Sequence, residues 1–275
     1  MMLSWRAWLT RERSPSWIIL TGLWLLILLL FPVGDWLSEG GAFPTLVGIV
    51  IVAQALAVTA MLRLDWSWRR LASGAVTVLL IAWAAEVLGS RFGLIFGAYD
   101  YGAALQPQLA GVPVLIPLAW AMLLPAAWAV AAGLISLRHR LAHAILSGFV
   151  FTAWDLYLDP QWVARGLWTW ETNGPYFGIP LENFAGWIAT AAVITFVVRP
   201  ADLQRALSPL AILYTIVAIT QAVALGLFWG QPGPALCGLL AMGGFSAAYW
   251  MRTRRSSRAR GLSEALHRSQ RLPRP

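Results

Sequence analysis

The sequence predicts an all-α fold, a polytopic transmembrane helical bundle of about eight spans with two long outer loops. Hydrophobic residues make up 59% of the 275 residues and charged residues 12%, proportions that suit a membrane protein and exclude a disordered chain. The apolar residues gather in stretches near the length of about 20 residues that a helix needs to cross a hydrocarbon core. Arginine-rich and arginine-poor connections alternate between these stretches, which supports the number of spans.

The first four spans are expected at residues 17–33, 44–62, 71–89 and 112–137. Arginines precede the first of them, as in a signal peptide, but no small-residue cleavage site follows. We therefore expect this span to remain as a membrane anchor. The fourth span contains Pro113, Pro117 and Pro125, which could break its helix.

The last four spans are expected at residues 141–158, 183–198, 209–229 and 233–251. Asp155 and Asp159 close the fifth span, and Pro160 is expected to end its helix there. Asn183 stands at the start of the sixth span, where it is either a helix cap or part of a site. The single cysteine, Cys237, lies in the last span and is expected to be a packing residue.

The arginines predict the orientation of the chain. All 20 basic residues are arginines, and only Arg91 and Arg165 fall on the side opposite the termini. Because positively charged segments stay in the cytoplasm, we expect both termini there and a multi-pass protein of the cell membrane. Residues 1–251 should form one transmembrane domain, and residues 252–275 a disordered, Arg-rich cytoplasmic tail. The tail is expected to fix topology at the membrane lipid; a patch for anionic lipid or nucleic acid is the alternative, and no nucleic-acid partner is expected.

The sequence lacks the residues that several kinds of cofactor require. The sequence has no lysine for a retinal Schiff base and no P-loop or dinucleotide fingerprint. Its histidines are His139, His143 and His267. The first two share a helix face, but no third ligand lies nearby, so polar helix-end residues are expected there instead of a metal site. We expect no cofactor and no metal.

Carboxyl groups gather at the outer ends of the spans. Glu86 lies about one turn inside the end of the third span, and Asp155 and Asp159 share one face of the fifth. An ionisable group in a membrane span is costly to bury, so it indicates function; a hydrogen bond to a neighbouring helix end is the structural alternative. Three other carboxyl groups are expected to be solvated or to brace the loops, namely Asp100, Glu171 and Glu182. The candidate catalytic groups are therefore Glu86, Asp155 and Asp159.

The two long outer loops, residues 90–111 and 159–182, are rich in glycine, proline and aromatic residues. We expect them to pack on the bundle as re-entrant or lid segments; an interfacial aromatic belt is the alternative. Crowded carboxyl groups away from water can remain protonated, and aromatic faces stabilise a developing carbocation. These properties favour the addition of water to the end of a long apolar molecule.

Two blocks of motifs carry a family resemblance over about residues 80–187. They contain Glu86-Val-Leu-Gly89, Phe96-Gly97-Ala-Tyr99-Asp-Tyr101, Pro117-Leu-Ala-Trp120, Asp155 to Asp159-Pro160, Trp168-Thr-Trp170, Gly174-Pro-Tyr176-Phe177-Gly178 and Asn183-Phe-Ala-Gly186-Trp187. On these motifs the chain resembles the carotenoid hydratase family of bacteria and archaea. The resemblance implies a membrane enzyme that hydrates the terminal C1,C2 double bond of an acyclic carotenoid ψ-end, of C40 (lycopene or γ-carotene) or C50 type, to a tertiary alcohol. Its partners would be the carotenoid, water and possible further enzymes of carotenoid biosynthesis.

We assign roles to the residues as a hypothesis. Asp155 or Glu86 protonates C2 of the alkene, and Asp159 or Asn183 holds the water that attacks the cation at C1. The substrate-binding residues are expected to be Tyr99, Tyr101, Trp120, Trp170, Tyr176 and Asn183.

Two other functions remain open at this point. Asp155 and Asp159 fit the DxxxD pattern that holds Mg²⁺ and a diphosphate in membrane prenyltransferases, although no second such motif is present. A transporter or carotenoid-binding protein is the other alternative, and an internal repeat, which would favour it, is not evident.

Overall fold

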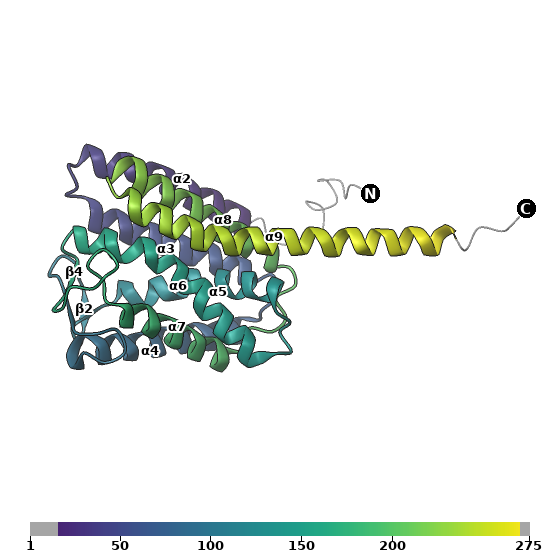
Figure 1. The fold of residues 1–275 in the computed structure, drawn as a ribbon, viewed down its shortest axis with the longest axis horizontal. Coiled ribbons are helices and arrows are strands. Elements are labelled where there is room, and N and C mark those ends of the chain that lie inside the picture. Colours follow the sequence, from purple (N-terminus) through teal and green to yellow (C-terminus); the bar gives the residue numbers. More distant parts are fainter. Residues whose placement is uncertain (1–15, 270–275) are drawn as a thin grey trace, which may run out of the picture.

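The structure, a computed structural model, describes residues 16–269, with side chains described as far as Arg255. In this part of the chain eight helices are long and apolar enough to cross a membrane (Figure 1). They are α2 (Ser16–Leu37), α3 (Phe43–Leu62), α4 (Trp68–Phe92), α5 (Leu115–Leu134), α6 (Arg140–Ala164), α7 (Leu181–Val198), α8 (Leu207–Val223), continued by the π-helical turn η1 (Ala224–Phe228), and α9 (Pro232–Ser269). The prediction of an all-α, eight-span membrane bundle is confirmed.

Several helix boundaries differ from those expected, and three of these differences concern residues singled out above. Helix α5 begins at Leu115, and Pro125 lies inside it without breaking it. Helix α6 does not end at Asp159 but continues through Pro160 to Ala164. Helix α9 continues beyond Met251 to Ser269. The division into a bundle and a cytoplasmic tail stays a prediction, since residues 270–275 lie outside the described part.

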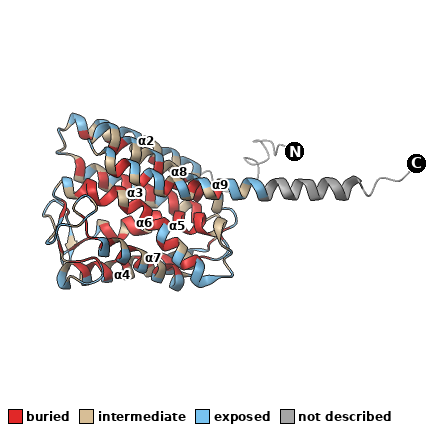
Figure 2. Ribbon diagram, viewed as in Figure 1, coloured by how far each residue is buried: buried red, intermediate tan, exposed pale blue. Residues whose placement is uncertain are grey.

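The core of the bundle is built around α5 and α6, which Figure 2 shows as its most buried helices. Residues Ile116 to Ala131 of α5 are buried on almost every side, as expected of a helix that is apolar all round. Helix α2 lies at the edge and leaves most of its leucines exposed, as suits a lipid-facing helix. Gly148 allows α6 to approach α7 closely because it has no side chain. A Cβ at this position would lie 2.5 Å from the carbonyl oxygen of Ile188.

The two long loops pair with each other at one end of the bundle. Strand β1 (Tyr99–Tyr101) of the first loop runs antiparallel to β4 (Trp168–Trp170) of the second, with Tyr99 opposite Trp170. Strands β2 (Gln108–Leu109) and β3 (Val112–Pro113) form a second small sheet. The paired residues lie about 70 positions apart in the chain and share neither a helix nor a hydrophobic period, so the sequence alone did not predict this sheet.

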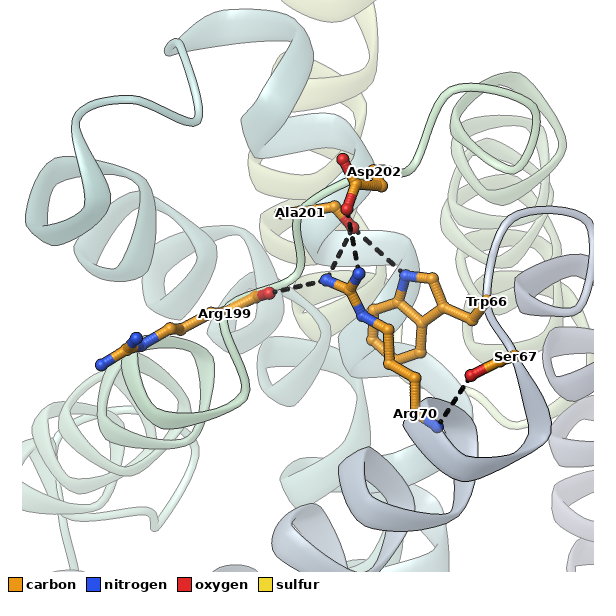
Figure 3. A network of polar contacts seen from close by, with 6 residues as sticks. All are labelled: Trp66, Ser67, Arg70, Arg199, Ala201 and Asp202. Atoms are coloured by element: carbon orange, nitrogen blue, oxygen red, sulfur yellow. Dashed lines mark hydrogen bonds and ion pairs between the residues drawn. The ribbon is translucent and has the colours of Figure 1, made fainter.

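A polar clamp holds the opposite end together (Figure 3). Arg70, at the start of α4, donates to the backbone oxygens of Arg199 and Ala201 and forms an ion pair with Asp202 at 3.0 Å. Its guanidinium also lies 4.8 Å from the ring centroid of Trp66, whose Nε1 donates to Ala201. These contacts fasten the first turn of α4 to the connection between α7 and α8.

Candidate active site

A small cavity lies at the strand-bearing end of the bundle, between α4, α5, α6 and α7 and under the β1–β4 pair. The space in it that the centre of a water molecule can reach is about 20 Å³, room for about one water. Its lining combines carboxyl, amide and phenol groups with aromatic rings: Glu86, Phe96, Tyr99, Tyr101, Ile116, Ala119, Trp120, Leu158, Asp159, Trp162, Trp168, Trp170, Asn183 and Trp187. Seven of the nine predicted site residues are among them.

Glu86 is buried in α4 and accepts hydrogen bonds from three aromatic side chains. Tyr99 and Tyr101 both donate to its Oε2, the latter at 2.7 Å, and Nε1 of Trp120 lies 3.2 Å from its Oε1. The tyrosines reach it from one strand, where residues two apart share a face. Gly89 makes this possible, since a Cβ there would lie 2.8 Å from the Phe96 ring and 3.0 Å from that of Tyr99.

Both phenols are suited to donate. Burial raises the pKa of Tyr99 and of Tyr101 above the ordinary value, and the nearby charge of Glu86 raises each pKa further. The two tyrosines therefore remain protonated at neutral pH and keep their hydrogen bonds to Glu86.

Asp155 and Asp159 form a second carboxyl cluster, held together by Asn183. Both carboxyl groups are buried on one face of α6, and Nδ2 of Asn183 lies 2.9 Å from Oδ2 of Asp155 and 2.5 Å from Oδ2 of Asp159. Oδ1 of Asp155 has no hydrogen-bond partner among the described residues. The N-cap of α7 is Pro180, so the alternative that Asn183 caps this helix is wrong. Its side chain instead joins α7 to the two aspartates.

Aromatic rings form the walls around these polar groups. Trp120 and Trp187 stack with centroids 4.6 Å apart, and Trp162 and Trp168 stack at 4.8 Å. Trp170 lies 5.7 Å from Tyr99. Trp168 and Trp187 were not among the predicted site residues, although both belong to the motifs quoted above; the signal that could have found Trp168 is its alternation with Trp170 along a strand.

The structure does not bring Asp155 and Tyr176 to the cavity wall. Asp155 lies behind Asp159, within reach of Asn183. Tyr176 donates at 2.9 Å to the carbonyl oxygen of Leu156 and packs against Phe184. Because Pro160 has no N–H, the Leu156 carbonyl lacks its helical donor, and Tyr176 replaces it. This contact explains why α6 continues past Pro160.

Of the histidines with described side chains, neither His139 nor His143 lines this cavity. His143 lies on α6 near its start, with Nε2 3.2 Å from the carbonyl oxygen of Trp128. Within residues 16–255 the structure holds no group of three or more His, Cys, Asp or Glu side chains arranged to bind a metal ion.

Comparisons with known proteins identify the family of the chain. Residues 45–245 match the family described as "Carotenoid biosynthesis protein", a region that contains all of the cavity residues. A curated protein of Haloarcula japonica named bisanhydrobacterioruberin hydratase is 32% identical to this chain over 128 residues. That alignment covers 46% of this chain and 43% of the relative, so less than half of the relative's length is matched. No solved structure matches the chain significantly. The protein is thus a multi-pass membrane protein that belongs to the carotenoid biosynthesis protein family.

Proposed function

We propose that this protein is a carotenoid hydratase that adds water to the terminal C1,C2 double bond of an acyclic carotenoid ψ-end. The proton adds to C2 and the hydroxyl to C1, which gives a tertiary alcohol and consumes only water. The name of the Haloarcula relative supports this reaction class. One observation carries the proposal. Glu86 and Asp159 line one aromatic cavity with room for a water molecule, and Asp155 adjoins it through Asn183.

The Asp155–Asp159 pair is the proton donor in this proposal. Neither carboxyl group forms an ion pair with an arginine in the described part of the chain, and the two are close enough to share a hydrogen bond. Two negative charges so close together and away from water would repel strongly, so the pair is best accommodated with one proton between them. Asp159 lines the cavity and delivers that proton to C2, while Asp155 lies behind it.

Glu86 then acts as the proton acceptor. Its two oxygens already accept three hydrogen bonds, an arrangement that suits a negatively charged group. Protonation at C2 leaves a tertiary cation at C1, which the faces of Trp120, Trp170 and Trp187 stabilise together with the charge of Glu86. The cavity water attacks C1 and gives its surplus proton to Glu86, from which the proton returns to the aspartates by way of the next water.

The rate enhancement that this reaction needs requires both the carboxyl groups and the aromatic walls of the site. General acid–base assistance contributes about 10²–10⁴ to a rate, which is too little to protonate an alkene at neutral pH. The remainder has to come from a preorganised surrounding that favours the cation over the neutral alkene. The buried rings and the fixed Glu86 carboxylate supply that surrounding.

Pigment extraction from a lycopene-producing host tests the proposal. Expression of the unaltered protein should give a more polar carotenoid that is heavier by one water molecule. Asp159→Asn and Glu86→Gln should each abolish this product while the protein still accumulates in membranes, and Asp155→Asn should do the same if the pair shares its proton. As a matched control, Asp100→Asn changes an exposed carboxyl group in β1 and should leave the product unaltered.

Unchanged pigment with the unaltered protein, in a host that also supplies C50 carotenoids, would reject hydration. Normal product from Asp159→Asn would reject the assigned donor alone.

A further inference from the structure

A second, larger cavity adjoins the site. It has a volume of about 390 Å³, within the range of about 300–1,000 Å³ typical of ligand pockets. Leu158 and Trp162 of α6 line both cavities, so the larger one adjoins the candidate active site at these two side chains. We call this larger cavity the side groove; α2, α3, α6 and α8 supply most of its walls.

The side groove reaches the lipid-facing surface between α2 and α8. Leu29 on α2 and Ile219 and Val223 on α8 line it, and all three are exposed. In a membrane-spanning bundle an exposed apolar side chain at mid-helix faces hydrocarbon, so a molecule dissolved in the bilayer can enter from the side. The π-helical turn η1, of a kind often found at functional sites, forms the end of this mouth.

The side groove is not purely apolar. Nε2 of Gln161 and Nε1 of Trp154 are buried donors without a hydrogen-bond partner among the described residues, and Oε1 of Gln221 is a buried acceptor without one. Gln161 and Trp154 are each 2% exposed. A third glutamine of the groove, Gln54, differs because its Nε2 donates to the carbonyl oxygen of Met122. Unpaired polar groups are costly to bury in a membrane protein and indicate a polar ligand group.

We infer that the side groove binds an isoprenoid chain bearing a hydroxyl group, with Gln161 and Gln221 as the residues that hold the hydroxyl. A hydroxyl donates one hydrogen bond and accepts others, so it satisfies an amide N–H and an amide oxygen together. The apolar walls take the chain, and the shared Leu158 and Trp162 connect it to the acid site. The nature of the chain rests on the proposed function.

Such a hydroxyl has two possible sources with the same chemistry. It is either the tertiary alcohol formed in the site, held while the product returns to the lipid, or a hydroxyl that the substrate already carries near its reacting end.

Binding without turnover tests the inference. Asp159→Asn protein in lipid nanodiscs would be titrated with lycopene and with its singly hydrated derivative, with quenching of tryptophan fluorescence as the signal. The hydrated carotenoid should bind about tenfold more tightly, the size expected of a net hydrogen bond. Combining Gln161→Met with Gln221→Met should remove this preference while the affinity for lycopene is retained. Gln54→Met is the matched control and should keep the preference.

Equal affinity for the two pigments in the parent protein, or a preference that survives in the double variant, would overturn the inference. If the double variant does not accumulate, the single Gln161→Met protein is tested in the same way and should lose most of the preference.

The lateral mouth has its own test. Ile219→Trp narrows the mouth and should slow the association of lycopene severalfold, whereas Ile212→Trp, at a lipid-exposed position of α8 outside the groove, should not. Equal association rates would contradict entry between α2 and α8.

Steady-state turnover in the active protein separates the two sources. If the glutamines hold a substrate hydroxyl, their replacement raises KM for hydroxylated substrates. If they hold the product alcohol, KM for lycopene is unchanged and inhibition by added hydrated product weakens. The binding test, unlike this turnover test, does not depend on the hydration proposal. If the active protein forms no alcohol, hydration is rejected, while the binding preference of the Asp159→Asn protein is judged by itself.

Discussion

At the scale of single residues, the site depends on which hydrogen-bond donors each of its carboxyl groups has. Glu86 has three aromatic donors, whereas Asp155 and Asp159 share one amide and leave an oxygen of Asp155 without a partner. The first arrangement suits a fixed acceptor and the second a group that exchanges a proton. This difference is the reason for assigning the base to Glu86 and the acid to the aspartates.

Tyr101→Phe tests the role of the donors to Glu86. Loss of a hydrogen bond to a charged group is worth about 1.5–3 kcal/mol, so product formation per molecule of protein should fall roughly 10- to 100-fold. Tyr157→Phe is the control, because Tyr157 is fully buried but its hydroxyl donates to the carbonyl of Ala218, away from the cavity. That change should lower thermal stability and leave turnover within about twofold. A Tyr101→Phe protein with normal turnover would remove the tyrosine from the proposed mechanism.

At the scale of elements, α6 positions both aspartates because it does not stop at Pro160. A helix that ended at Asp159 would free this carboxyl group to point away from Asn183. Tyr176, from the second outer loop, prevents this by donating to the Leu156 carbonyl that the proline leaves without a helical donor. The loop therefore supports the site although Tyr176 does not touch it.

A double-mutant cycle measures this support. Tyr176→Phe leaves the Leu156 carbonyl unpaired and should destabilise the protein by about 1–3 kcal/mol. In the Pro160→Ala background the restored N–H can bond to Leu156, so the same change should cost much less there. Thermal unfolding in detergent gives both values. Equal losses in the two backgrounds would show that Tyr176 acts through other contacts.

At the scale of the whole molecule, the site and the Arg70 clamp lie at opposite ends of the bundle. The start of α2 and the far end of α9 both lie at the clamp end (Figure 1). Among the arginines at the described ends of α3 to α8, two lie at the site end, Arg91 and Arg165, and the others lie at the clamp end: Arg63, Arg69, Arg70, Arg138, Arg140, Arg199 and Arg205. From the positive-inside rule we expect the site at the outer face of the membrane.

Reporter fusions check this orientation. Green fluorescent protein, which fluoresces only when it folds in the cytoplasm, should be bright when fused after Pro275. A fusion of the same reporter after truncation at Gly102, in the first outer loop, should be dark. The reverse pattern would move the site to the cytoplasmic face and reopen the prenyltransferase alternative.

Chelation separates the reaction classes for the protein as a whole. The proposed hydration uses only side chains and water, so EDTA should leave turnover in isolated membranes within about twofold, since none of its steps needs Lewis-acid assistance. An Asp155–Asp159 site for Mg²⁺ and diphosphate predicts loss of activity in EDTA and recovery with added Mg²⁺. The pigment product is the readout in both cases.

The sequence by itself determined the eight membrane spans, because the partition of an apolar segment into a bilayer depends on composition over about 20 consecutive residues. It also pointed to Glu86, Asp159 and the aromatic loops, since an ionisable group in a span is unusual wherever the span packs. Only the tertiary structure decided the partners: that Asn183 joins two aspartates, that β1 pairs with β4, and that Tyr176 serves α6 and not the cavity. Each of these contacts joins residues far apart in the chain, and the free energy that selects them comes from packing in three dimensions, which no local pattern encodes.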